Sequence, residues 1–258
     1  MGVSKVCKTS DKRADYSIES HHTKPNGILS DLTDAHDAEH RKDKQMVIGI
    51  MGDSGSGKTT AFRNIDPKTT VYVDCDKKGL SWKGWKKDFN TDNKNYLVTD
   101  RPDVARTMLS KVNKEPGFKN VKTIVFDTIN GLMVADEMRR SREKGYDKWQ
   151  DLAVSIYGLV DDALTVRDDL NVFFIAHTQT EMDDAGYQFT HIKTSGRKLD
   201  KIVLESKFPC VLLAKCVDGK YVFETQSNRS TAKSPLGMFD SKEIDNDINI
   251  VLKALKDF

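Results

Sequence analysis

Eight consecutive residues from Gly52 to Thr59 have the composition and spacing of a loop that binds phosphate groups. They match the pattern G-x-x-x-x-G-K-[ST] in full. Glycines here let the backbone curl until its amides point at phosphate oxygens, while Lys58 reaches the β- and γ-phosphates and Thr59 ligates Mg²⁺. A connecting Gly/Ser turn is the alternative, but an apolar segment before the loop and a helix expected from about Lys58 favour binding. The residues expected to hold the nucleotide are Gly52, Asp53, Ser54, Gly55, Ser56, Gly57, Lys58, Thr59 and Thr60.

A second group for the metal follows another apolar segment. The run Thr123-Ile124-Val125-Phe126-Asp127 reads as a strand that ends on an acid. At the end of such a strand, Asp127 is expected to bind Mg²⁺ through water, beside Thr59. The alternative is an aspartate that only ends a strand.

Hydrolysis also needs a group that orients or deprotonates the attacking water. Asp74 and Asp76 directly follow the apolar run 71–73, and His177 follows the apolar run 172–176. A parallel sheet brings the carboxyl ends of its strands to one edge, so these side chains are expected near the γ-phosphate. We predict that Asp76 is the catalytic acid, with solvated loop acids as the alternative. His177 is expected either to contact the γ-phosphate or to be structural.

Strands and helices alternate along the chain and predict an α/β fold. The fold class expected is a mostly parallel sheet flanked by helices, with late antiparallel strands. Expected strands are 47–50, 71–73, 121–126 and 172–176, expected helices begin near 58 and 102 and span 147–168, and an Asp-Gly turn joins a hairpin of 211–217 and 221–225.

Composition limits the class of protein. The 258 residues carry 41 basic and 39 acidic side chains, a net charge of +2, which argues against a polycation that binds through its whole surface. No apolar run is long enough to span a bilayer, so a cytoplasmic protein with no membrane partner is expected. The four cysteines form no C-x-x-C pair and are expected to be reduced.

The chain divides at residue 46. Residues 1–45 contain four of the six histidines and few large apolar residues, which predicts a flexible N-terminal arm. Residues 46–258 are expected to form one phosphate-loop NTPase domain.

The order of the motifs resembles the RecA-like ATPase core. The run Val125-Phe126-Asp127-Thr128-Ile129-Asn130-Gly131-Leu132 is similar to the second RecA-type motif, in which Asp is followed by Ser or Thr and then Leu. The resemblance implies a RecA-like P-loop NTPase core with ATP as the nucleotide. It also implies a catalytic acid at Asp76, one methylene shorter than the usual Glu, and a phosphate sensor at His177, where the family keeps Gln or, in some branches, His.

From Met46 onward, about four-fifths of the chain looks like the single-domain RecA-like ATP-binding proteins of bacteriophages, some of them described as single-strand annealing proteins. The segments that carry the resemblance are Lys78-Gly79-Leu80-Ser81-Trp82-Lys83-Gly84-Trp85, Gly145-Tyr146-Asp147-Lys148-Trp149, Ala176-His177-Thr178, Gly196-Arg197-Lys198-Leu199-Asp200 and Thr231-Ala232-Lys233-Ser234-Pro235-Leu236-Gly237-Met238-Phe239. Membership would put the protein in the host cytoplasm, in DNA recombination or replication.

Two segments are candidates for single-stranded DNA. The run 77–94 carries six lysines interleaved with aromatic residues, a combination that suits bases and phosphates. The alternative is that the indoles are core anchors beside solvated lysines. The polar segment 178–202 is expected to be a loop, and the resemblance implies that it contacts DNA; an ordinary surface loop is the alternative. The contacts expected are Trp82, Lys83, Trp85, Lys86, Arg197 and Lys198.

The resemblance further implies a homo-oligomer in which Arg229 and Lys233 reach a neighbour's nucleotide. The first hypothesis for function is an ATPase that binds single-stranded DNA and promotes annealing or strand pairing, with a single-strand DNA-binding protein as a further partner. The second is an ATP-gated module that switches a protein partner with little turnover. A small-molecule kinase would need an arginine-rich lid, and a GTPase would need an N-K-x-D motif, which does not occur.

Overall fold

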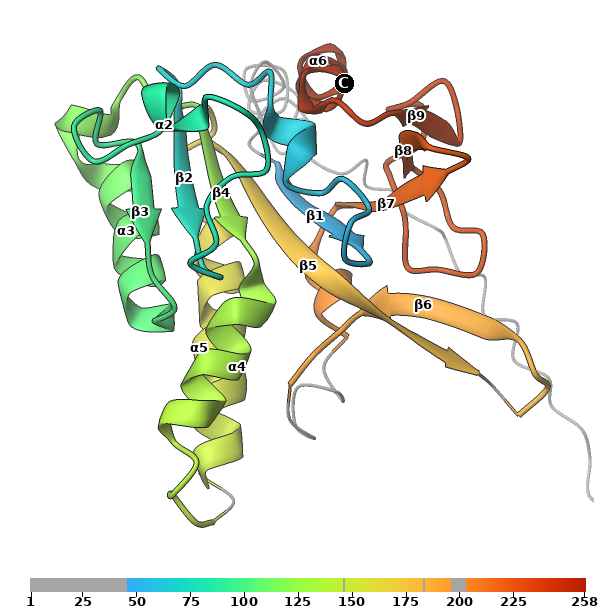
Figure 1. Ribbon diagram of the computed structural model, residues 1–258, viewed down its shortest axis with the longest axis horizontal. Coiled ribbons are helices and arrows are strands. Elements are labelled where there is room, and N and C mark those ends of the chain that lie inside the picture. The colour runs from blue at the N-terminus through green and yellow to red at the C-terminus, as the bar shows by residue number, and fades with distance from the viewer. Residues whose placement is uncertain (1–45, 146, 183, 196–202) are drawn as a thin grey trace, which may run out of the picture. The chain divides into compact units, whose positions relative to one another are not determined.

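The computed structural model describes residues 46–145, 147–182, 184–195 and 203–258, so the predicted N-terminal arm lies outside the described residues. The predicted α/β class is confirmed by a nine-stranded sheet with the order β3-β2-β4-β5-β1-β7-β8-β9, and β6 pairs with β5 (Figure 1). The strands are β1 (Val47–Gly52), β2 (Thr70–Asp74), β3 (Tyr96–Val98), β4 (Thr123–Asp127), β5 (Asn171–Met182), β6 (Gln188–Ile192), β7 (Cys210–Val217), β8 (Lys220–Glu224) and β9 (Glu243–Asp245). Strands β1 to β5 and β7 are parallel, and β6, β8 and β9 add antiparallel pairs.

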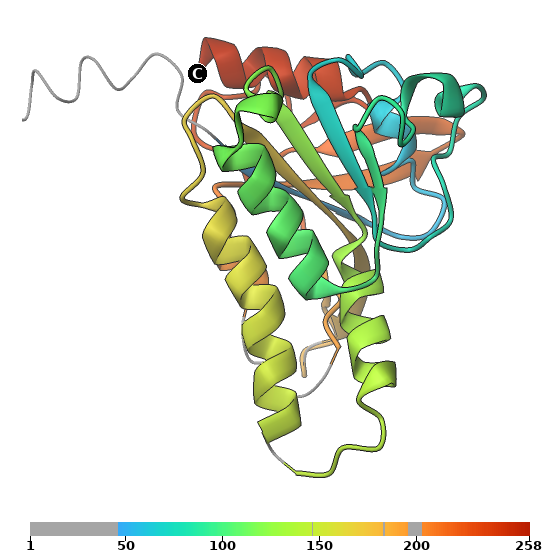
Figure 2. The same cartoon turned by 90° about the vertical axis from the view of Figure 1, so that its left-hand side faces the viewer.

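Helices cover the sheet. They are α2 (Trp85–Asp88), α3 (Pro102–Lys114), α4 (Ile129–Arg139), α5 (Asp147–Ala163) and α6 (Ile248–Asp257), with short 3-10 turns η1 (Thr60–Phe62), η2 (Pro116–Phe118) and η4 (Leu204–Lys207). Figure 2 shows α3 and α5 packed beside each other against the sheet, with α4 next to them. In the part of the chain that the structure describes, no helix is long and apolar enough to cross a membrane.

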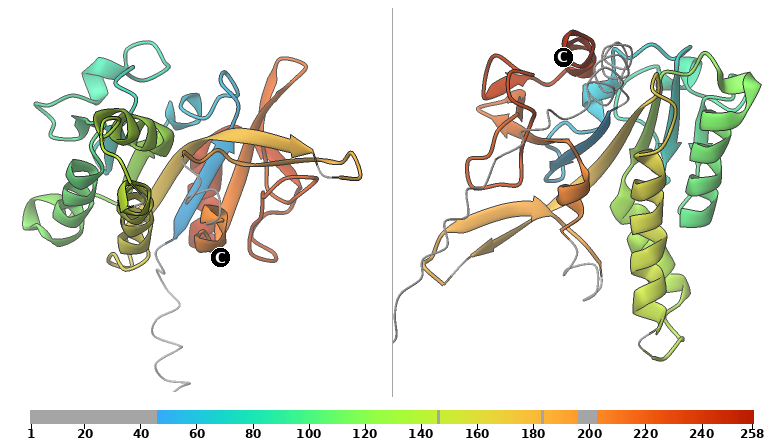
Figure 3. Two further views of the ribbon diagram at one scale, coloured as in Figure 1. Left: turned by 90° about the horizontal axis from the view of Figure 1, so that it is seen from below. Right: turned by 180° about the vertical axis from the view of Figure 1, so that it is seen from behind.

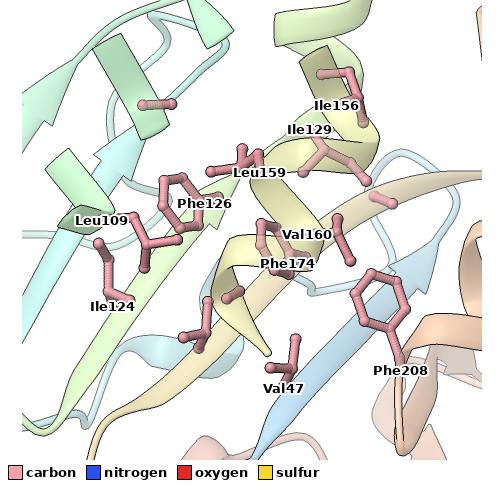
Figure 4. Close-up of a cluster of buried hydrophobic side chains, with 14 of the residues drawn as sticks. Val47, Leu109, Ile124, Phe126, Ile129, Ile156, Leu159, Val160, Phe174 and Phe208 are labelled. Carbon is pink, nitrogen blue, oxygen red and sulfur yellow. The ribbon is translucent and has the colours of Figure 1, made fainter. Parts of the chain in front are cut away.

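Two clusters of buried side chains fill the two faces of the sheet. Neighbouring residues of the central strands belong to different clusters: Phe126 and Phe174 pack with α3, α4 and α5, whereas Val125 and Phe173 pack with η1 and α6. Figure 4 shows the first cluster, where the rings of Phe126 and Phe174 stack with centroids 5.1 Å apart. Because both faces are covered, the central strands are apolar throughout, as parallel strands usually are.

The prediction of a helix that begins near Lys58 is wrong in its extent. Only η1 forms there, and β2 begins at Thr70. Pro67 disfavours helical backbone at Asp66, so the segment turns back after one helical turn. The phosphate loop therefore rests on a short turn, and Phe62 anchors that turn in the second cluster.

The loop expected over residues 178–202 is also wrong in its first half. Strand β5 continues beyond Ala176 to Met182 and pairs with β6, forming a hairpin that projects from the sheet (Figures 1 and 3). By contrast, the predicted hairpin of β7 and β8 is confirmed, with Asp218 and Gly219 both at positive φ as its tight turn requires.

Candidate nucleotide-binding site

The phosphate loop, residues 52–59, leaves the carboxyl end of β1 in the middle of the sheet (Figure 1). Strand register puts Gly52 opposite His177 and Asp74 opposite Asp127. The candidate residues from four strands therefore lie along one edge of the sheet, the edge at which parallel α/β proteins bind ligands.

Asp127 lies at the centre of this edge. Its Oδ2 accepts hydrogen bonds from Thr59 Oγ1 and Tyr72 Oη, both at 2.6 Å. The side chain is 2% exposed, and burial raises the pKa of its carboxyl group, an effect that the nearby Lys78 opposes. The Oδ1 atom has no hydrogen-bond partner among the described residues. A hydroxyl beside a carboxylate with a free buried oxygen is a donor set that suits Mg²⁺, and Thr59 and Asp127 would hold it.

Lys58 folds back over the phosphate loop. Its Nζ donates hydrogen bonds to the carbonyl oxygens of Gly52, at 2.7 Å, and Asp53, at 2.6 Å. Burial lowers the pKa of this ammonium group to about 8, against the opposing attraction of Asp127. The charge is thus kept inside the loop by two neutral acceptors, and a phosphate group would be a stronger partner for it.

Asp76 and Asp74 have different surroundings. Thr128 Oγ1 donates to Asp76 Oδ1 at 3.0 Å, and Lys78 Nζ lies 2.7 Å from Asp76 Oδ2 and 3.9 Å from Asp127 Oδ1. Asp74 instead accepts from Tyr96 Oη at 2.7 Å and from the Gly79 amide at 2.8 Å. Asp74 therefore holds the segment after β2 in place, whereas Asp76 and Asp127 both lie near the Lys78 ammonium group at this edge of the sheet.

The start of α4 allows this approach only because residue 131 is glycine. A Cβ atom on Gly131 would lie 2.3 Å from Asp76 Oδ1 and 2.6 Å from the Cys75 carbonyl oxygen, distances that atoms do not adopt. The absence of a side chain there lets Asp76 lie against the first turn of α4.

His177 is half-buried where β5 leaves the sheet. Burial, together with the positive charge of Lys58, lowers the pKa of its imidazole, so the ring is neutral near pH 7. Its backbone amide donates to Asn130 Oδ1 at 2.7 Å, and Asn130 Nδ2 donates to the Lys193 carbonyl at 2.7 Å. A cavity of about 350 Å³ opens between Asp76, Asn130 and His177.

The candidate DNA contacts are distributed over several places. Trp82 and Trp85 are half-buried against the second cluster, with Trp82 edge-on to Phe89 at 6.1 Å, while Lys83 and Lys86 are exposed. Arg197 and Lys198 lie outside the described residues.

The two proposed trans-acting residues both follow β8 in the chain but have different surroundings. The guanidinium of Arg229 sits over the ring of Tyr187, 5.6 Å from its centroid, beside the β5–β6 hairpin. Lys233 pairs with Val211 through its backbone, at the edge of β7.

Four further residues contribute to this region and were missed in the sequence: Tyr72, Lys78, Asn130 and Asn246. Lys78 and Asn130 closely follow the acids at 76 and 127, so their positions after two strand ends are a usable signal. Tyr72 is hidden in an apolar run, and Asn246 is close to the phosphate loop only in space.

The comparisons with known proteins agree with this geometry. A family model described as AAA domain matches residues 44–236, about three quarters of the chain. No curated protein gives a significant match to the sequence. The matched segment contains the phosphate loop, Asp76, Asp127 and His177, and the chain therefore belongs to the AAA domain family of nucleotide-binding P-loop NTPases.

Proposed function

We propose that this protein is a Mg²⁺-dependent ATPase of RecA-like type that binds single-stranded DNA and promotes annealing or strand pairing in bacteriophage DNA recombination or replication. In this proposal Lys58 and the amides of the phosphate loop bind the phosphates, and Thr59 and Asp127 hold the metal. Bound Mg²⁺ would neutralise charge on the β- and γ-phosphates. Asp76 accepts a proton from the attacking water, and neutral His177 contacts the γ-phosphate.

The observation that carries the DNA part of the proposal is the link between the nucleotide edge and the β5–β6 hairpin. Thr178 Oγ1 donates to Asp53 of the phosphate loop, and Asn130 bonds to both arms of the hairpin at its base, through His177 and Lys193. A change in the phosphate loop or in α4 therefore acts on the hairpin directly. Such a link is what an ATPase needs when its ligand is bound beyond the sheet.

The hairpin has the side chains that single-stranded DNA requires. Tyr187 is 58% exposed and Phe189 45% exposed, and Arg229 lies over the Tyr187 ring. These residues line a hollow of about 450 Å³. Exposed aromatic rings stack on bases whatever their sequence.

The test is the rate of ATP hydrolysis without DNA, with single-stranded DNA and with duplex, at several salt concentrations. Stimulation by single strands is expected, and it should weaken as salt rises. The variant Phe189→Ala should lose most of the stimulation but keep the basal rate. Phe258→Ala, which removes a phenyl ring that is 61% exposed at the end of α6, is the matched control and should behave as wild type. A rate of ATP hydrolysis that does not change when single-stranded DNA is added would contradict the proposal.

One observation favours the second candidate, an ATP-gated module that switches a protein partner. Both oxygens of Asp76 are already engaged, one by Thr128 and the other by Lys78, which leaves the acid less available to water. If ATP binds without turnover in the presence or absence of DNA, this candidate replaces the first.

A further inference from the structure

Asn246 is a buried residue between β9 and α6 that is held firmly through its backbone. Its backbone carbonyl oxygen accepts a hydrogen bond from the Arg63 side chain at 2.7 Å, and its backbone amide donates to the Tyr221 carbonyl at 3.3 Å. Arg63 belongs to the turn that follows the phosphate loop. The position of Asn246 relative to that turn is therefore fixed from two sides.

The side chain of Asn246 lies against the phosphate loop. A Cβ atom on Gly57 would be 3.3 Å from Asn246 Oδ1, 3.4 Å from Nδ2 and 2.7 Å from Cδ1 of Tyr221. Only glycine fits at position 57, because a Cβ atom would be too close to Tyr221 and because the backbone φ there is +89°, which favours glycine. The three residues thus form a close contact at the end of the loop that leads into Lys58 and Thr59.

The side-chain amide of Asn246 makes no hydrogen bond to the described part of the chain. The residue is 4% exposed, and neither Oδ1 nor Nδ2 has a hydrogen-bond partner within the described ranges. A buried amide with both polar atoms idle is costly, and such groups are rare unless a ligand or water completes them. Tyr221, which lies against the same glycine, is 47% exposed, so its ring can move without disturbing the core.

We infer that Asn246 and Tyr221 form the site for the nucleotide base and that this site selects adenine. This inference rests on nucleotide binding by the phosphate loop. A side-chain amide offers one donor and one acceptor side by side, which matches the N6 amino group and the adjacent ring nitrogen of adenine. On the edge that carries N7, guanine presents two acceptors, O6 and N7, so one half of the amide would face a like group. Tyr221 supplies a ring on which the base stacks.

The experiment measures the affinities of Mg-ATP, Mg-GTP and inorganic tripolyphosphate for the full chain by calorimetry, without DNA. Wild type should prefer ATP over GTP by roughly tenfold to a hundredfold, the range of one two-point contact to a base. Asn246→Ala should remove the preference and leave tripolyphosphate binding unchanged. Asn246→Asp should shift the preference toward GTP, because a carboxylate accepts from the N1–H and N2 amino groups of guanine. Asn249→Ala, an exposed asparagine of α6, is the matched control and should keep the wild-type preference.

Tyr221→Leu gives a second readout at an exposed position that does not threaten folding. It should weaken ATP and GTP alike, by roughly tenfold, and not tripolyphosphate. Equal affinity of wild type for ATP and GTP, or an undiminished preference in Asn246→Ala, would overturn the inference. The proposed function fails separately: absence of binding by ATP and tripolyphosphate would refute the nucleotide site, whereas ATP preference without stimulation by DNA would refute only the DNA role.

Discussion

Burial of the Lys58 ammonium group makes nucleotide binding depend on pH. Its pKa is about 8 in the free protein, and phosphates at the loop would raise that value because they stabilise the charged form. Above about pH 8 binding must therefore take up a proton, and affinity for ATP should fall as pH rises. Calorimetry at pH 9 in two buffers of different ionisation enthalpy should report this uptake, and equal heats in both buffers would contradict it.

The same group affects the stability of the free protein with the opposite dependence. Between about pH 8 and its ordinary value of 10.5, the unfolded chain binds the proton that the folded chain has lost. The contribution of Lys58 to the free energy of unfolding therefore rises with pH in this window. Lys58→Ala is the control: it should lose nucleotide binding and the proton uptake, and keep the circular dichroism of the fold.

Asp74, the last residue of β2, and Asp76, which follows it, are expected to differ in what their loss does. Asp76→Asn should lower the rate of ATP hydrolysis by roughly 10²- to 10⁴-fold, the usual contribution of a general base, and leave ATP affinity nearly unchanged. Asp74→Asn should instead lower the melting temperature, because Asp74 accepts from Tyr96 and Gly79 and lies in the core. Rates of hydrolysis and thermal unfolding curves for both variants separate the roles. A normal rate in Asp76→Asn would remove Asp76 from the reaction.

Among the site residues, the sequence predicted those that a local pattern marks. The phosphate loop is contiguous, and Asp76, Asp127 and His177 each follow an apolar run, so their meeting at one edge follows from parallel pairing. Asn246 and Gly57 meet through the packing of α6 against η1, a contact between distant parts of the chain that no local pattern encodes.

Among the elements, the β5–β6 hairpin is the feature that the sequence did not predict. The turn between its strands contains Gly186, which has φ of +81°, so a turn signal is present. Polar residues on both faces conceal it, because the hairpin leaves the core and no apolar face marks its register. The prediction of a helix after the phosphate loop failed for the opposite reason. The motif is usually followed by a helix, but here Pro67 leaves too little chain for one.

Asn130 is the contact through which α4 holds the base of this hairpin. Asn130→Ala would leave the His177 amide and the Lys193 carbonyl without their partner, which should cost about 1–3 kcal/mol of unfolding free energy. Amide hydrogen exchange of β6 should become faster, and stimulation by single-stranded DNA should fall while ATP still binds.

Asn130→Asp is the matched variant for this prediction. It keeps the acceptor for the His177 amide and removes only the donor to Lys193. If the bond to Lys193 couples the sites, both variants lose DNA stimulation. Unchanged stimulation in both would show that α4 has no part in the coupling.

For the whole molecule, the testable question is whether one copy completes the site of another. Arg229 is exposed beside the hairpin, away from the buried core of its own chain, a position from which it can reach a neighbour. Arg229→Ala and Lys58→Ala should each hydrolyse ATP poorly alone. A mixture of the two should regain part of the activity, because a Lys58→Ala copy supplies its arginine to a copy that still binds ATP. Hydrolysis rates of mixtures over a range of ratios test this, and strict additivity would contradict a shared site.

The continuity of β5 has a mechanical consequence. One unbroken strand contains Phe173 and Phe174 in the core, His177 at the nucleotide edge and Met182 near the hairpin tip. The stretch from His177 to Met182 spans about 17 Å at the usual rise of a strand. Because no loop interrupts this stretch, a tilt of the strand at His177 would be transmitted to the hairpin tip. A tilt at His177 too small to break its hydrogen bond to Asn130 would displace the hairpin tip by a larger distance. The length of the projecting part of β5 therefore sets how far the tip would move.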